Sequence, residues 1–469
     1  MTSRKIYPNA LHGEYPIFSQ ARPSIIARAL DSNFGYGLNL SRPSGVKLLG
    51  EKLFDRLQYL LDGHKPADLT SKLDQCLESH GLIEGATVKS TPNLEKDTKS
   101  LNFWVHLVNG CNLSCYYCYI PRIEQEMNTS ELKRCSFNSE SIEPVLKRIF
   151  AYCQQSGIDR LSLKFAGGEP TLNLPLLEYF CSTAARLKGE VQVKFGIISN
   201  GTFTDINVIR ILSKFRFSVS LSIDGGQQNH DRVRYQVGAD RAKVGTWTQI
   251  WRNIGQFQDA GLRPYVLYTV TGANVRDLPE FRDTAASNKI GYRLGLVRMA
   301  TPHTKLAVKQ IAHELVSFYK YAGNHQPTSL PIEKYARFSE WSLDRKKSFV
   351  CSSGRNSFSI DQQGNIATCQ MRQDKTYGNA AKDDFATIRE RVGNCGEQVV
   401  LARPELRKGP CSCCEYTYVC GGGCPQHTKI SFGGFNHTSP WCYVYGKLLP
   451  HYVEAVAKQM LRRFYEVQR

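Results

Sequence analysis

The chain has 469 residues, 41% of them apolar, and 60 lysines and arginines against 42 acidic residues give a net charge of +18. This length and composition exclude a peptide or a disordered tail and allow one large core or two smaller ones. The charge favours acidic partners, such as a flavodoxin or ferredoxin, an acidic peptide or nucleic acid. Because the basic residues are spread along the chain, nucleic acid is the least favoured of these partners.

Sixteen cysteines need an explanation in a chain that is long enough to fold without disulfides. The first residues, MTSRKIYPNALHGEYP, contain no apolar segment of the kind found in secretion signals. No apolar run is long enough to span a membrane. We therefore predict a cytoplasmic protein without a membrane partner, in which thiols stay reduced and clustered cysteines indicate metal.

Residues 1–84 are expected to form a small N-terminal module. Apolar residues recur at near-helical spacing over 44–61 and again over 62–83, after a Gly-His-Lys-Pro break. The polar, turn-rich residues 85–100 then predict a linker.

Six β-rich runs alternate with amphipathic helical segments, such as 140–156 and 246–260, between residues 101 and 300. The runs are LNFWVHL, RLSLKFA, VKFGIIS, SVSLSID, PYVLYTV and YRLGLV. This alternation predicts an α/β fold, in which a parallel sheet curls into a partial (β/α)6 barrel of TIM type with its chemistry at the carboxyl ends of the strands.

The last third of the chain lacks this alternation. Residues 301–344 are expected to bridge from the barrel to a Cys-rich region over 345–445, which is rich in Gly, Cys and aromatic residues. We attribute the shape of this region to bound metal rather than to a hydrophobic core. A final helix over 446–469 is predicted to end the chain.

The first cysteine array follows the first β run in VNGCNLSCYYCYI, where Cys111, Cys115 and Cys118 are separated by three and then two residues. Three thiolates on one loop can hold three irons of a 4Fe-4S cluster and leave the fourth iron open for a ligand. Zinc is the alternative, but a structural zinc site needs four closed ligands and no fourth Cys or His lies nearby.

Three further motifs follow the next three β runs: FAGGEPTL (165–172), SNGT (199–202) and SIDG (222–225). Together with Cys-x3-Cys-x2-Cys and its aromatic residue before the last Cys, this series resembles radical S-adenosylmethionine (SAM) enzymes. The resemblance covers about 200 residues of the chain. It implies a 4Fe-4S cluster that cleaves SAM to a 5′-deoxyadenosyl radical, which then takes a hydrogen atom from a substrate.

The resemblance also implies roles for the strand-end residues. Glu169 would face the ammonium group of SAM, and the glycines before it would let the backbone approach the ligand closely. The serine of SIDG and its neighbours would lie on the ribose side. The candidate cofactor-binding residues are Tyr117, Gly167, Gly168, Glu169, Ser199, Asn200, Ser222 and Asp224.

A second array of cysteines near the C-terminus resembles the SPASM domain, an extension that holds two auxiliary clusters. The cysteine pattern of that domain implies one auxiliary cluster closed by four cysteines and another held by three. Together with the cluster of the first array, this makes three 4Fe-4S clusters. Two zinc sites are the alternative. Cys395 or Cys413 could complete the three-cysteine cluster. The closed set is Cys411, Cys414, Cys420 and Cys442, and the other is Cys351, Cys369 and Cys424.

SPASM-bearing radical SAM enzymes mostly act on peptides and proteins, so the resemblance implies a maturase of ribosomally synthesised peptides, with a flavodoxin or ferredoxin as electron donor. Residues 35–85 look like the winged-helix element that binds leader peptides by strand addition at a sheet edge. The alternative is a helical brace that covers the barrel with Leu53, Leu57 and Leu60.

Two other functions remain open. The chain resembles anaerobic sulfatase-maturating enzymes in both arrays and in SIDG…HDRVR (222–234), but Gln370 stands where that family has an acid that serves as base. An iron–sulfur electron-transfer or binding protein is the alternative of another class, although it would have no use for a nucleoside pocket. The sequence identifies neither a catalytic acid or base nor the bond that is formed.

Overall fold

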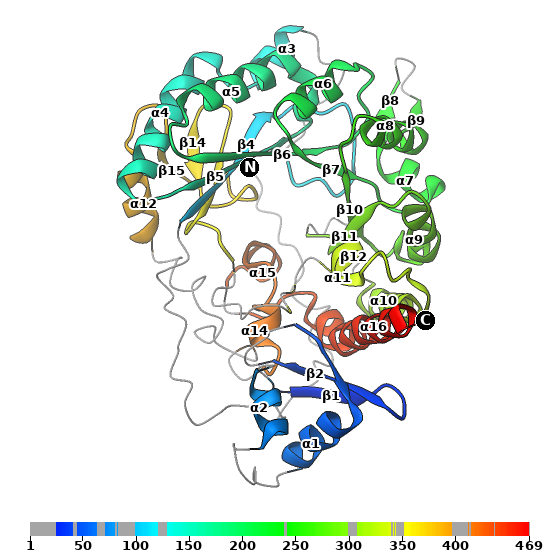
Figure 1. The fold of residues 1–469 in the computed structure, drawn as a ribbon. Helices are drawn as coiled ribbons and strands as arrows, with labels where there is room; N and C mark the ends of the chain where they lie inside the picture. The colour runs from blue at the N-terminus through cyan, green and yellow to red at the C-terminus, as the bar shows by residue number, and fades with distance from the viewer. Residues whose placement is uncertain are drawn as a thin grey trace.

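The computed structural model describes residues 25–40, 45–62, 71–79, 82, 99–120, 129–238, 242–298, 307–338, 341, 343, 351–395, 411, 414–435 and 437–468. A mostly parallel sheet curves through the upper part of the molecule, and a small separate sheet lies at the bottom (Figure 1). These features confirm the predicted α/β class. Within the described ranges, no helix is long and apolar enough to cross a membrane.

The large sheet contains the six predicted strands in their predicted positions. Its order is β12-β11-β10-β7-β6-β5-β4-β13-β14-β15. Neighbouring strands from β12 to β13 are parallel, so their carboxyl ends lie at one edge. The predicted strands are β4 (Ser100–Val108), β5 (Arg160–Gly167), β6 (Gln192–Ser199), β7 (Ser218–Ser222), β10 (Tyr265–Val270) and β11 (Gly291–Leu296). The additional strands are β12 (Ala336–Phe338), β13 (Ser357–Ile360), β14 (Asn365–Ala367) and β15 (Thr376–Asn379).

Helices cover one face of this sheet. Phe165 of β5 packs edge-on against Phe180 of α5 at 5.2 Å, and Tyr292 of β11 packs against Phe281 of α9 at 5.1 Å. Residues that alternate with these, on the opposite side of each strand, make up what we call the inner face. The barrel helices are α3 (Thr129–Cys135), α4 (Ser139–Gln155), α5 (Leu174–Leu187), α6 (Asn207–Lys214), α7 (Gln227–Val233), α8 (Trp247–Asp259) and α9 (Leu278–Ser287). A hairpin, β8 (Tyr235–Val237) and β9 (Lys243–Gly245), and two 3-10 turns, Pro170–Asn173 and Val275–Asp277, complete this part.

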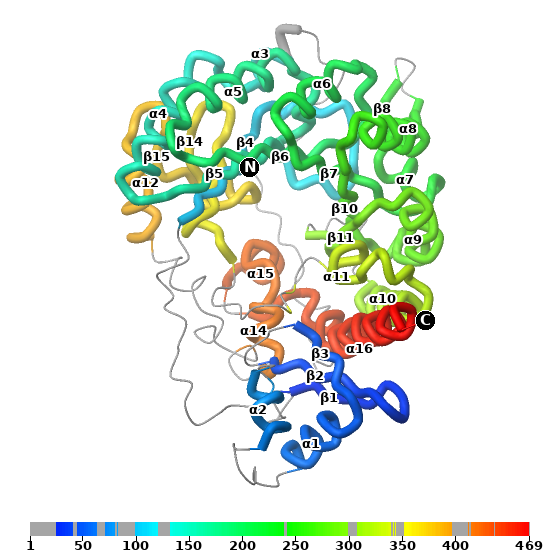
Figure 2. Tube along the Cα trace, in the orientation of Figure 1, coloured from blue at the N-terminus to red at the C-terminus, as the bar shows by residue number. Residues whose placement is uncertain are grey.

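Two long helices join the barrel to the rest of the chain. Helix α10 (Val308–His325) packs along α16 (Cys442–Gln468), with Tyr319 and Tyr452 in edge contact at 4.9 Å. The short α11 (Ile332–Tyr335) leads into β12. The predicted final helix is confirmed, although it begins at Cys442 rather than at 446. In the tube view α16 lies beside the N-terminal module (Figure 2).

The N-terminal module is an antiparallel sheet followed by two helices. It consists of β1 (Ile25–Ala29), β2 (Phe34–Asn39), β3 (Lys47–Gly50), α1 (Glu51–Leu61) and α2 (Lys72–Ser79). The expected helix over 44–61 is wrong in its first part, because residues 47–50 pair with β2 as an edge strand. The predicted linker falls almost entirely outside the described residues.

The module has two apolar clusters with different partners. Tyr36, Leu38, Leu40 and Val46 belong to the main core, and β2 and β3 contact α16. The second cluster is the module's own core, and Leu53 and Leu60 pack against it. The expectation that Leu53, Leu57 and Leu60 cover the barrel is therefore wrong, since these residues pack within the module and its sheet contacts α16. The members of the second cluster are Leu49, Leu57, Leu77 and Leu82.

The Cys-rich region has more apolar packing than its composition predicted. Strand β13 extends the large sheet beside β4, and the ring of Phe358 lies 5.1 Å from that of Phe385. Both rings contact Phe103 of β4. Our attribution of this region's shape to metal alone is therefore wrong for residues 357–393. Its helices are α12 (Phe385–Gly393), α14 (Thr417–Cys420) and α15 (Pro425–Phe432).

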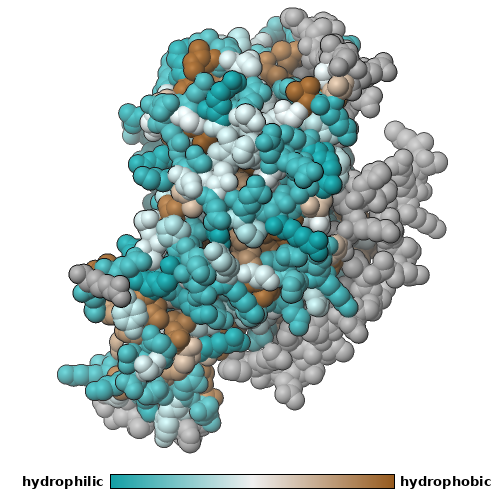
Figure 3. Space-filling view, turned by 90° about the vertical axis from the view of Figure 1, so that its right-hand side faces the viewer, coloured by the Kyte–Doolittle hydropathy of each residue, from teal (hydrophilic) through white to brown (hydrophobic). Residues whose placement is uncertain are grey.

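The outer face over α7 to α10 is mostly hydrophilic (Figure 3). Apolar residues appear there in small groups, with a larger group on the narrow lower part of the molecule. Near that part, exposed Phe464 and Tyr465 of α16 contact Phe34 of β2 at 5.1 and 5.9 Å. The contact adds a second connection between the module and α16.

Candidate iron–sulfur and S-adenosylmethionine site

The loop after β4 carries the first cysteine array. Cys115 is buried, Cys111 is half-buried and Cys118 is exposed. The Leu113 N–H donates to Cys111 Sγ at 3.4 Å. Burial raises the pKa of Cys111 to about 12, and the charges of Glu169, Cys115 and Cys118 raise it further. The structure thus brings the three thiols together at the carboxyl ends of the parallel strands.

Glu169 follows β5 and is 1% exposed. Its carboxylate accepts hydrogen bonds from the Thr171 N–H and hydroxyl at 3.0 and 2.7 Å, from Ser199 Oγ at 2.9 Å and from the Asn200 N–H at 2.6 Å. Burial raises the pKa of Glu169, and these donors act in the opposite direction. The carboxylate is therefore fixed in position beside the cysteine loop.

The glycines of the GGEP motif contact the cysteine loop. A Cβ on Gly167 would lie 2.2 Å from the Val108 carbonyl oxygen, and one on Gly168 would lie 2.0 Å from the Gly110 carbonyl oxygen. The backbone N–H of Gly168 donates to Val108 O at 2.7 Å, and that of Glu169 donates to Gly110 O at 2.8 Å. The structure gives a further reason for these glycines, because they permit close packing of two strand ends, while their approach to a ligand stays a prediction.

The SNGT motif connects Glu169 to the cysteine loop. Besides donating its backbone N–H to Glu169, Asn200 donates its side-chain amide to Asn112 Oδ1 at 2.8 Å and to Cys111 Sγ at 3.8 Å. The Ser199 hydroxyl accepts the Gly201 N–H at 3.0 Å. Asn200 therefore contacts the first array directly, whereas Ser199 positions Glu169 beside it.

The SIDG motif places a buried carboxylate beside the same array. Asp224 Oδ1 accepts the Thr269 N–H at 2.7 Å, while Oδ2 accepts hydrogen bonds from the Tyr117 hydroxyl and from Arg234 Nε. The guanidinium of Arg234 lies 5.4 Å from the centre of the Tyr117 ring, and its Nη1 donates to Cys115 Sγ at 3.7 Å. Tyr117 and Asp224 are thus linked to Cys115 through Arg234.

His230 supports this network from behind. Its Nδ1 accepts the Asp224 N–H at 3.2 Å, and its Nε2 lies 3.1 Å from Thr246 Oγ1. Burial lowers the pKa of His230 to about 4, so the ring is neutral at pH 7 and its proton is assigned to Nε2. The Thr246 hydroxyl in turn donates to Arg234 O at 2.8 Å.

We did not predict Arg234 or His230 as site residues. The sequence HDRVR (230–234) contained a signal for them. A basic residue that closely follows an acidic residue at the end of a strand indicates a buried ion pair. The remaining SIDG candidate, Ser222, is 8% exposed at the end of β7.

The second array forms two groups. Burial raises the pKa of Cys369 to about 12, and Cys424 and Cys351 also act on it. Burial likewise raises the pKa of Cys442 to about 12, and its three neighbouring cysteines raise it further. The structure therefore brings together the two sets implied by the SPASM resemblance. The second group is Cys411, Cys414, Cys420 and Cys442.

Tyr119 lies where the two arrays meet. Burial raises its pKa, and the charges that act on it come from Arg298, Cys369, Cys118 and Cys424. Cys118 belongs to the first array, while Cys369 and Cys424 belong to the second. The first loop and the three-cysteine group are therefore neighbours.

The donor chemistry of these groups fits iron–sulfur clusters. Cysteine thiolates are the usual cluster ligands, and hydrogen bonds to the sulfurs, such as those from Asn200 and Arg234, tune such clusters. In the part of the chain that the structure describes, no group of three or more His, Cys, Asp or Glu side chains is arranged to hold a single metal ion.

The other cysteines have different surroundings. Cys135, Cys153 and Cys181 are buried in the main core, and Cys395 packs against that core. Cys76 is half-buried in α2. Cys413 lies outside the described residues, and Gln370 directly follows Cys369 in a half-buried turn.

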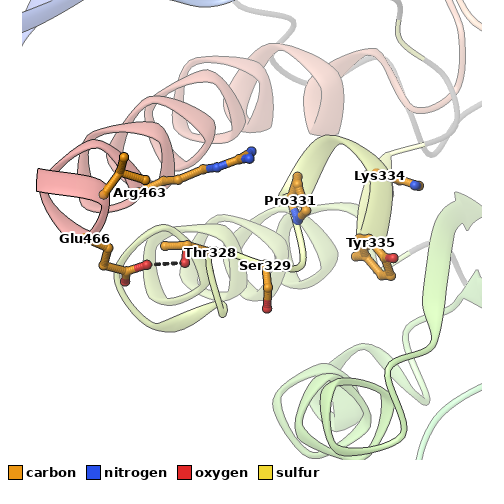
Figure 4. A pocket seen from close by; sticks show the side chains of 8 residues that line it. Thr328, Ser329, Pro331, Lys334, Tyr335, Arg463 and Glu466 are labelled. Carbon is orange, nitrogen blue, oxygen red and sulfur yellow. Dashed lines mark hydrogen bonds between the residues drawn. The ribbon is translucent and has the colours of Figure 1, made fainter.

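A surface hollow of about 460 Å³ lies between α11 and the end of α16 (Figure 4). Thr328 donates a hydrogen bond to Glu466 at one side of it. Lys334, Tyr335 and Arg463 also line the hollow. None of its lining residues is a predicted site residue.

Comparison with known proteins identifies the barrel. Residues 105–285 match the family model of the radical SAM superfamily. The chain is 29% identical over 222 residues to Fe-coproporphyrin III synthase of Methanosarcina barkeri, which is 45% of this chain and 48% of that protein. It is 28% identical over 149 residues to the cysteine-type anaerobic sulfatase-maturating enzyme of Clostridium novyi, which is 31% of this chain and 37% of that enzyme. The chain thus aligns with about half or less of these curated relatives.

Solved structures share the wider fold. Native anSMEcpe with bound AdoMet and Cp18Cys peptide superposes with a TM-score of 0.58 at 17% identity, over 78% of this chain and 98% of that one. Streptococcus suis SuiB bound to precursor peptide SuiA gives 0.51 at 13% identity, over 90% and 98%. The chain contains a radical SAM domain, a family that implies a 4Fe-4S cluster and S-adenosylmethionine as cofactors.

Proposed function

We propose that the chain modifies a ribosomally synthesised peptide by radical SAM chemistry. The observation that carries this proposal is the position of Tyr119, which lies beside Cys118 of the first array and beside Cys369 and Cys424 of the second. An auxiliary cluster next to the reactive one fits a substrate-modifying enzyme better than a protein that only stores clusters. The peptides in the anSMEcpe and SuiB structures support a peptide as substrate.

The first array would hold the cluster that binds SAM, through Cys111, Cys115 and Cys118. When bound, the cluster and SAM supply a 5′-deoxyadenosyl radical that abstracts hydrogen from the substrate. Glu169 would provide a fixed negative charge for the ammonium of SAM, because its four donors hold the carboxylate in place. Asp224 would act on the cluster through Arg234.

The second array would hold two auxiliary clusters, for three in all. The group around Cys442 has four cysteines and would close its cluster, whereas the group around Cys369 has three. Cysteine thiolates in both groups could also bind zinc, which is the alternative. Iron and sulfide analysis must therefore distinguish the metals.

The test is anaerobic reconstitution of the full chain. We expect about twelve irons and twelve labile sulfides per chain. Dithionite-reduced protein should release 5′-deoxyadenosine from SAM. Coexpression with a short peptide encoded by a neighbouring gene, followed by mass spectrometry, would identify the bond. Native protein that carries zinc without labile sulfide, or reduced protein that makes no 5′-deoxyadenosine, would contradict the proposal.

The N-terminal module would bind the leader part of such a peptide. Its sheet has β1 and β3 as edge strands, and a peptide can add to such an edge through main-chain hydrogen bonds. Deletion of residues 1–95 should weaken peptide binding and leave cluster content unchanged. Because Tyr36 and Leu38 belong to the main core, a melting curve must accompany this test. Unchanged peptide affinity in the truncated protein would contradict leader binding.

An acidic electron carrier, such as a flavodoxin or ferredoxin, would be the electron donor, since the chain has a net charge of +18. Oxidation of a Cys or Ser in a protein is the second candidate reaction, and the similarity to sulfatase-maturating enzymes favours it. Gln370 argues against it, because an amide cannot accept a proton at neutral pH. A sulfatase-derived peptide that is oxidised by the wild-type protein would establish this second reaction.

A further inference from the structure

His106 of β4 lies on the inner face of the curved sheet. The residue before it, Val105, stands opposite Phe165, which packs toward the helices. Because side chains alternate along a strand, His106 points to the other side. It stands opposite Ala166, directly before the GGEP motif, and is 1% exposed. A polar side chain is therefore buried on the inner face, near the carboxyl ends of the strands.

One nitrogen of this ring is paired and the other is not. Nδ1 lies 3.1 Å from Asn109 Oδ1, an oxygen that only accepts hydrogen bonds, so the proton of the neutral ring is assigned to Nδ1. Nε2 is buried and has no hydrogen-bond partner among the described residues. Burial lowers the pKa of His106, so the ring is neutral at pH 7. Nε2 therefore carries an unpaired acceptor, a feature that needs an explanation because burial of such an atom costs stability.

The first cysteine loop begins beside the His106 ring. Asn109, the partner of Nδ1, lies two residues before Cys111. Its Oδ1 would be 3.5 Å from a Cβ on Gly167. The contact between His106 and Asn109 therefore places the ring close to the point where the cysteine loop and the GGEP motif meet.

The loop that follows Cys369 of the second array reaches the same face from β13. Ser359 of β13 stands opposite Trp104 of β4. Gln373, four residues after Cys369, donates a hydrogen bond to Ser359 Oγ at 3.0 Å. His106 is two residues beyond Trp104 on the same face of the strand. It therefore lies on the part of the sheet that both cysteine-bearing loops contact.

We propose that Nε2 of His106 is the base that accepts a proton from the peptide substrate. This proposal rests on the proposed function, and it supplies the proton acceptor that Gln370 cannot be. A C–H bond of the substrate breaks and its hydrogen atom goes to the 5′-deoxyadenosyl radical. One proton of the substrate then goes to Nε2, and one electron goes to an oxidised iron–sulfur cluster of the second array. The carbon forms its new bond to the atom that lost the proton.

Asp361 is placed to stabilise the ring after this proton transfer. It directly follows β13, and its carboxylate accepts the Asn365 N–H at 2.8 Å and the Asn365 side-chain amide at 2.9 Å. The negative charge of Asp361 acts against burial in setting the pKa of His106, because it favours the protonated ring. The neutral ring is therefore the resting form, and a fixed carboxylate favours the imidazolium that the reaction produces.

The experiment compares wild type with His106→Leu and His106→Gln, each reconstituted as the full chain. The substrate is the peptide from the neighbouring gene that coexpression tests, prepared in perdeuterated form so that hydrogen abstraction appears as deuterium in 5′-deoxyadenosine. Leucine removes both ring nitrogens, whereas glutamine offers an acceptor oxygen that takes no proton at neutral pH. The matched control is His451→Leu, at a half-buried position of α16.

We expect both His106 variants to modify the peptide at least about 100-fold more slowly than wild type, because a general base contributes about 10²–10⁴-fold. Deuterium should still appear in 5′-deoxyadenosine, since the proton leaves after the hydrogen atom. Peptide affinity, measured by fluorescence anisotropy, should stay within about twofold of wild type, because the base acts in the transition state. His451→Leu should modify the peptide at the wild-type rate.

Stability gives a second readout, which does not depend on catalysis. His106→Leu should melt within about 3 °C of wild type and keep its iron, because loss of the contact with Asn109 is offset by removal of the unpaired nitrogen. A histidine that served only the core would lower the melting temperature when replaced.

Three results would overturn the proposal. Wild-type modification by His106→Gln would reduce the role of the ring to hydrogen bonding, and absence of deuterium transfer in both variants would assign His106 to peptide binding. A melting temperature lowered by more than about 10 °C in His106→Leu would assign it to the core. If wild type itself leaves the peptide unmodified, the proposed function fails and this inference with it. An active wild type with equally active variants contradicts the role of His106 alone.

Discussion

The two cysteine arrays are built in different ways. The first lies within residues 111–118, on one loop at the end of one strand, and backbone hydrogen bonds from Gly168 and Glu169 hold the start of that loop. The second extends from Cys351 to Cys442, and its two groups come together only through the packing of β13, β14 and helices α14 to α16. A local spacing therefore specifies the first array, whereas the tertiary fold specifies the second.

The substitutions with the largest expected effect test whether the two arrays have separate roles. Cys115→Ala should abolish 5′-deoxyadenosine formation and peptide modification, because it removes a ligand of the SAM-binding cluster. Cys420→Ala should lose peptide modification while uncoupled 5′-deoxyadenosine formation continues. Chromatography of SAM products measures both, and Cys76→Ala, in the N-terminal module, is the control. SAM cleavage at background level in a folded Cys420→Ala protein would contradict separate roles.

Substitution of all three first-array cysteines by Ala should remove one cluster and leave the other two. We expect a loss of about four of twelve irons per chain. Mössbauer spectra and iron analysis measure this loss. Loss of all iron would show that the second array depends on the first.

Glycine substitutions compare the packing of the two arrays. Gly168→Ala should displace the cysteine loop and lower cluster content strongly, because the new Cβ would lie 2.0 Å from the backbone oxygen of Gly110. Gly423→Ala should have a smaller effect, since its Cβ would meet side-chain rather than backbone atoms, Ser439 Oγ at 2.7 Å and Ser439 Cβ at 2.8 Å, although φ is +76° there. Gly255→Ala, in α8 with open space around it, should raise stability by about 1 kcal/mol. Iron content and urea unfolding measure these effects, and equal iron loss in the first two variants would contradict the difference.

The ion pairs beside the two arrays should also differ in how much they contribute to the free energy of unfolding. Asp224→Ala removes the partner of Arg234, whose side chain is 10% exposed, and should cost about 3–5 kcal/mol because a charge remains buried. Asp374→Ala near the second array should cost no more than about 1 kcal/mol, since Asp374 is 71% exposed where it pairs with Arg372. Urea denaturation measures both. Similar costs at the two positions would show that Asp224 is not a structural centre of the first array.

The smallest expected effect is a pH dependence near the first array. His230 has a pKa of about 4 when folded, against about 6.5 when unfolded, so unfolding takes up a proton at lower pH. Its contribution to stability is therefore complete above pH 6.5 and falls between pH 6.5 and 4, by at most about 3 kcal/mol. His230→Asn should flatten this part of the stability curve, whereas substitution of exposed His313 by Asn should leave it unchanged. A wild-type slope retained in His230→Asn would exclude His230 as its source.

The sequence was sufficient for the barrel because strand runs, helices and strand-end motifs repeat in a fixed order. It was not sufficient for contacts between motifs. Asn200 reaches Cys111, and Arg234 reaches Cys115, only because separate strands end at the same edge. Edge strand β3 was missed because Leu48 and Leu49 continue the helical spacing of α1, and only pairing with β2 distinguishes them. The apolar packing around Phe358 was hidden by the Cys and Gly content of its surroundings.

The parallel pairing of β4 with β13 also has a consequence for biosynthesis. Strand β4 is the first barrel strand to leave the ribosome, yet its partner on one side, Ser357–Ile360, is translated only after the rest of the barrel. A nascent chain therefore carries an open strand edge with exposed Phe103, a combination that invites pairing with other chains. The cysteines of the second array lie on both sides of β13 in the sequence, so they come together only late in synthesis. Release from the ribosome should therefore precede the loading of iron at the second array.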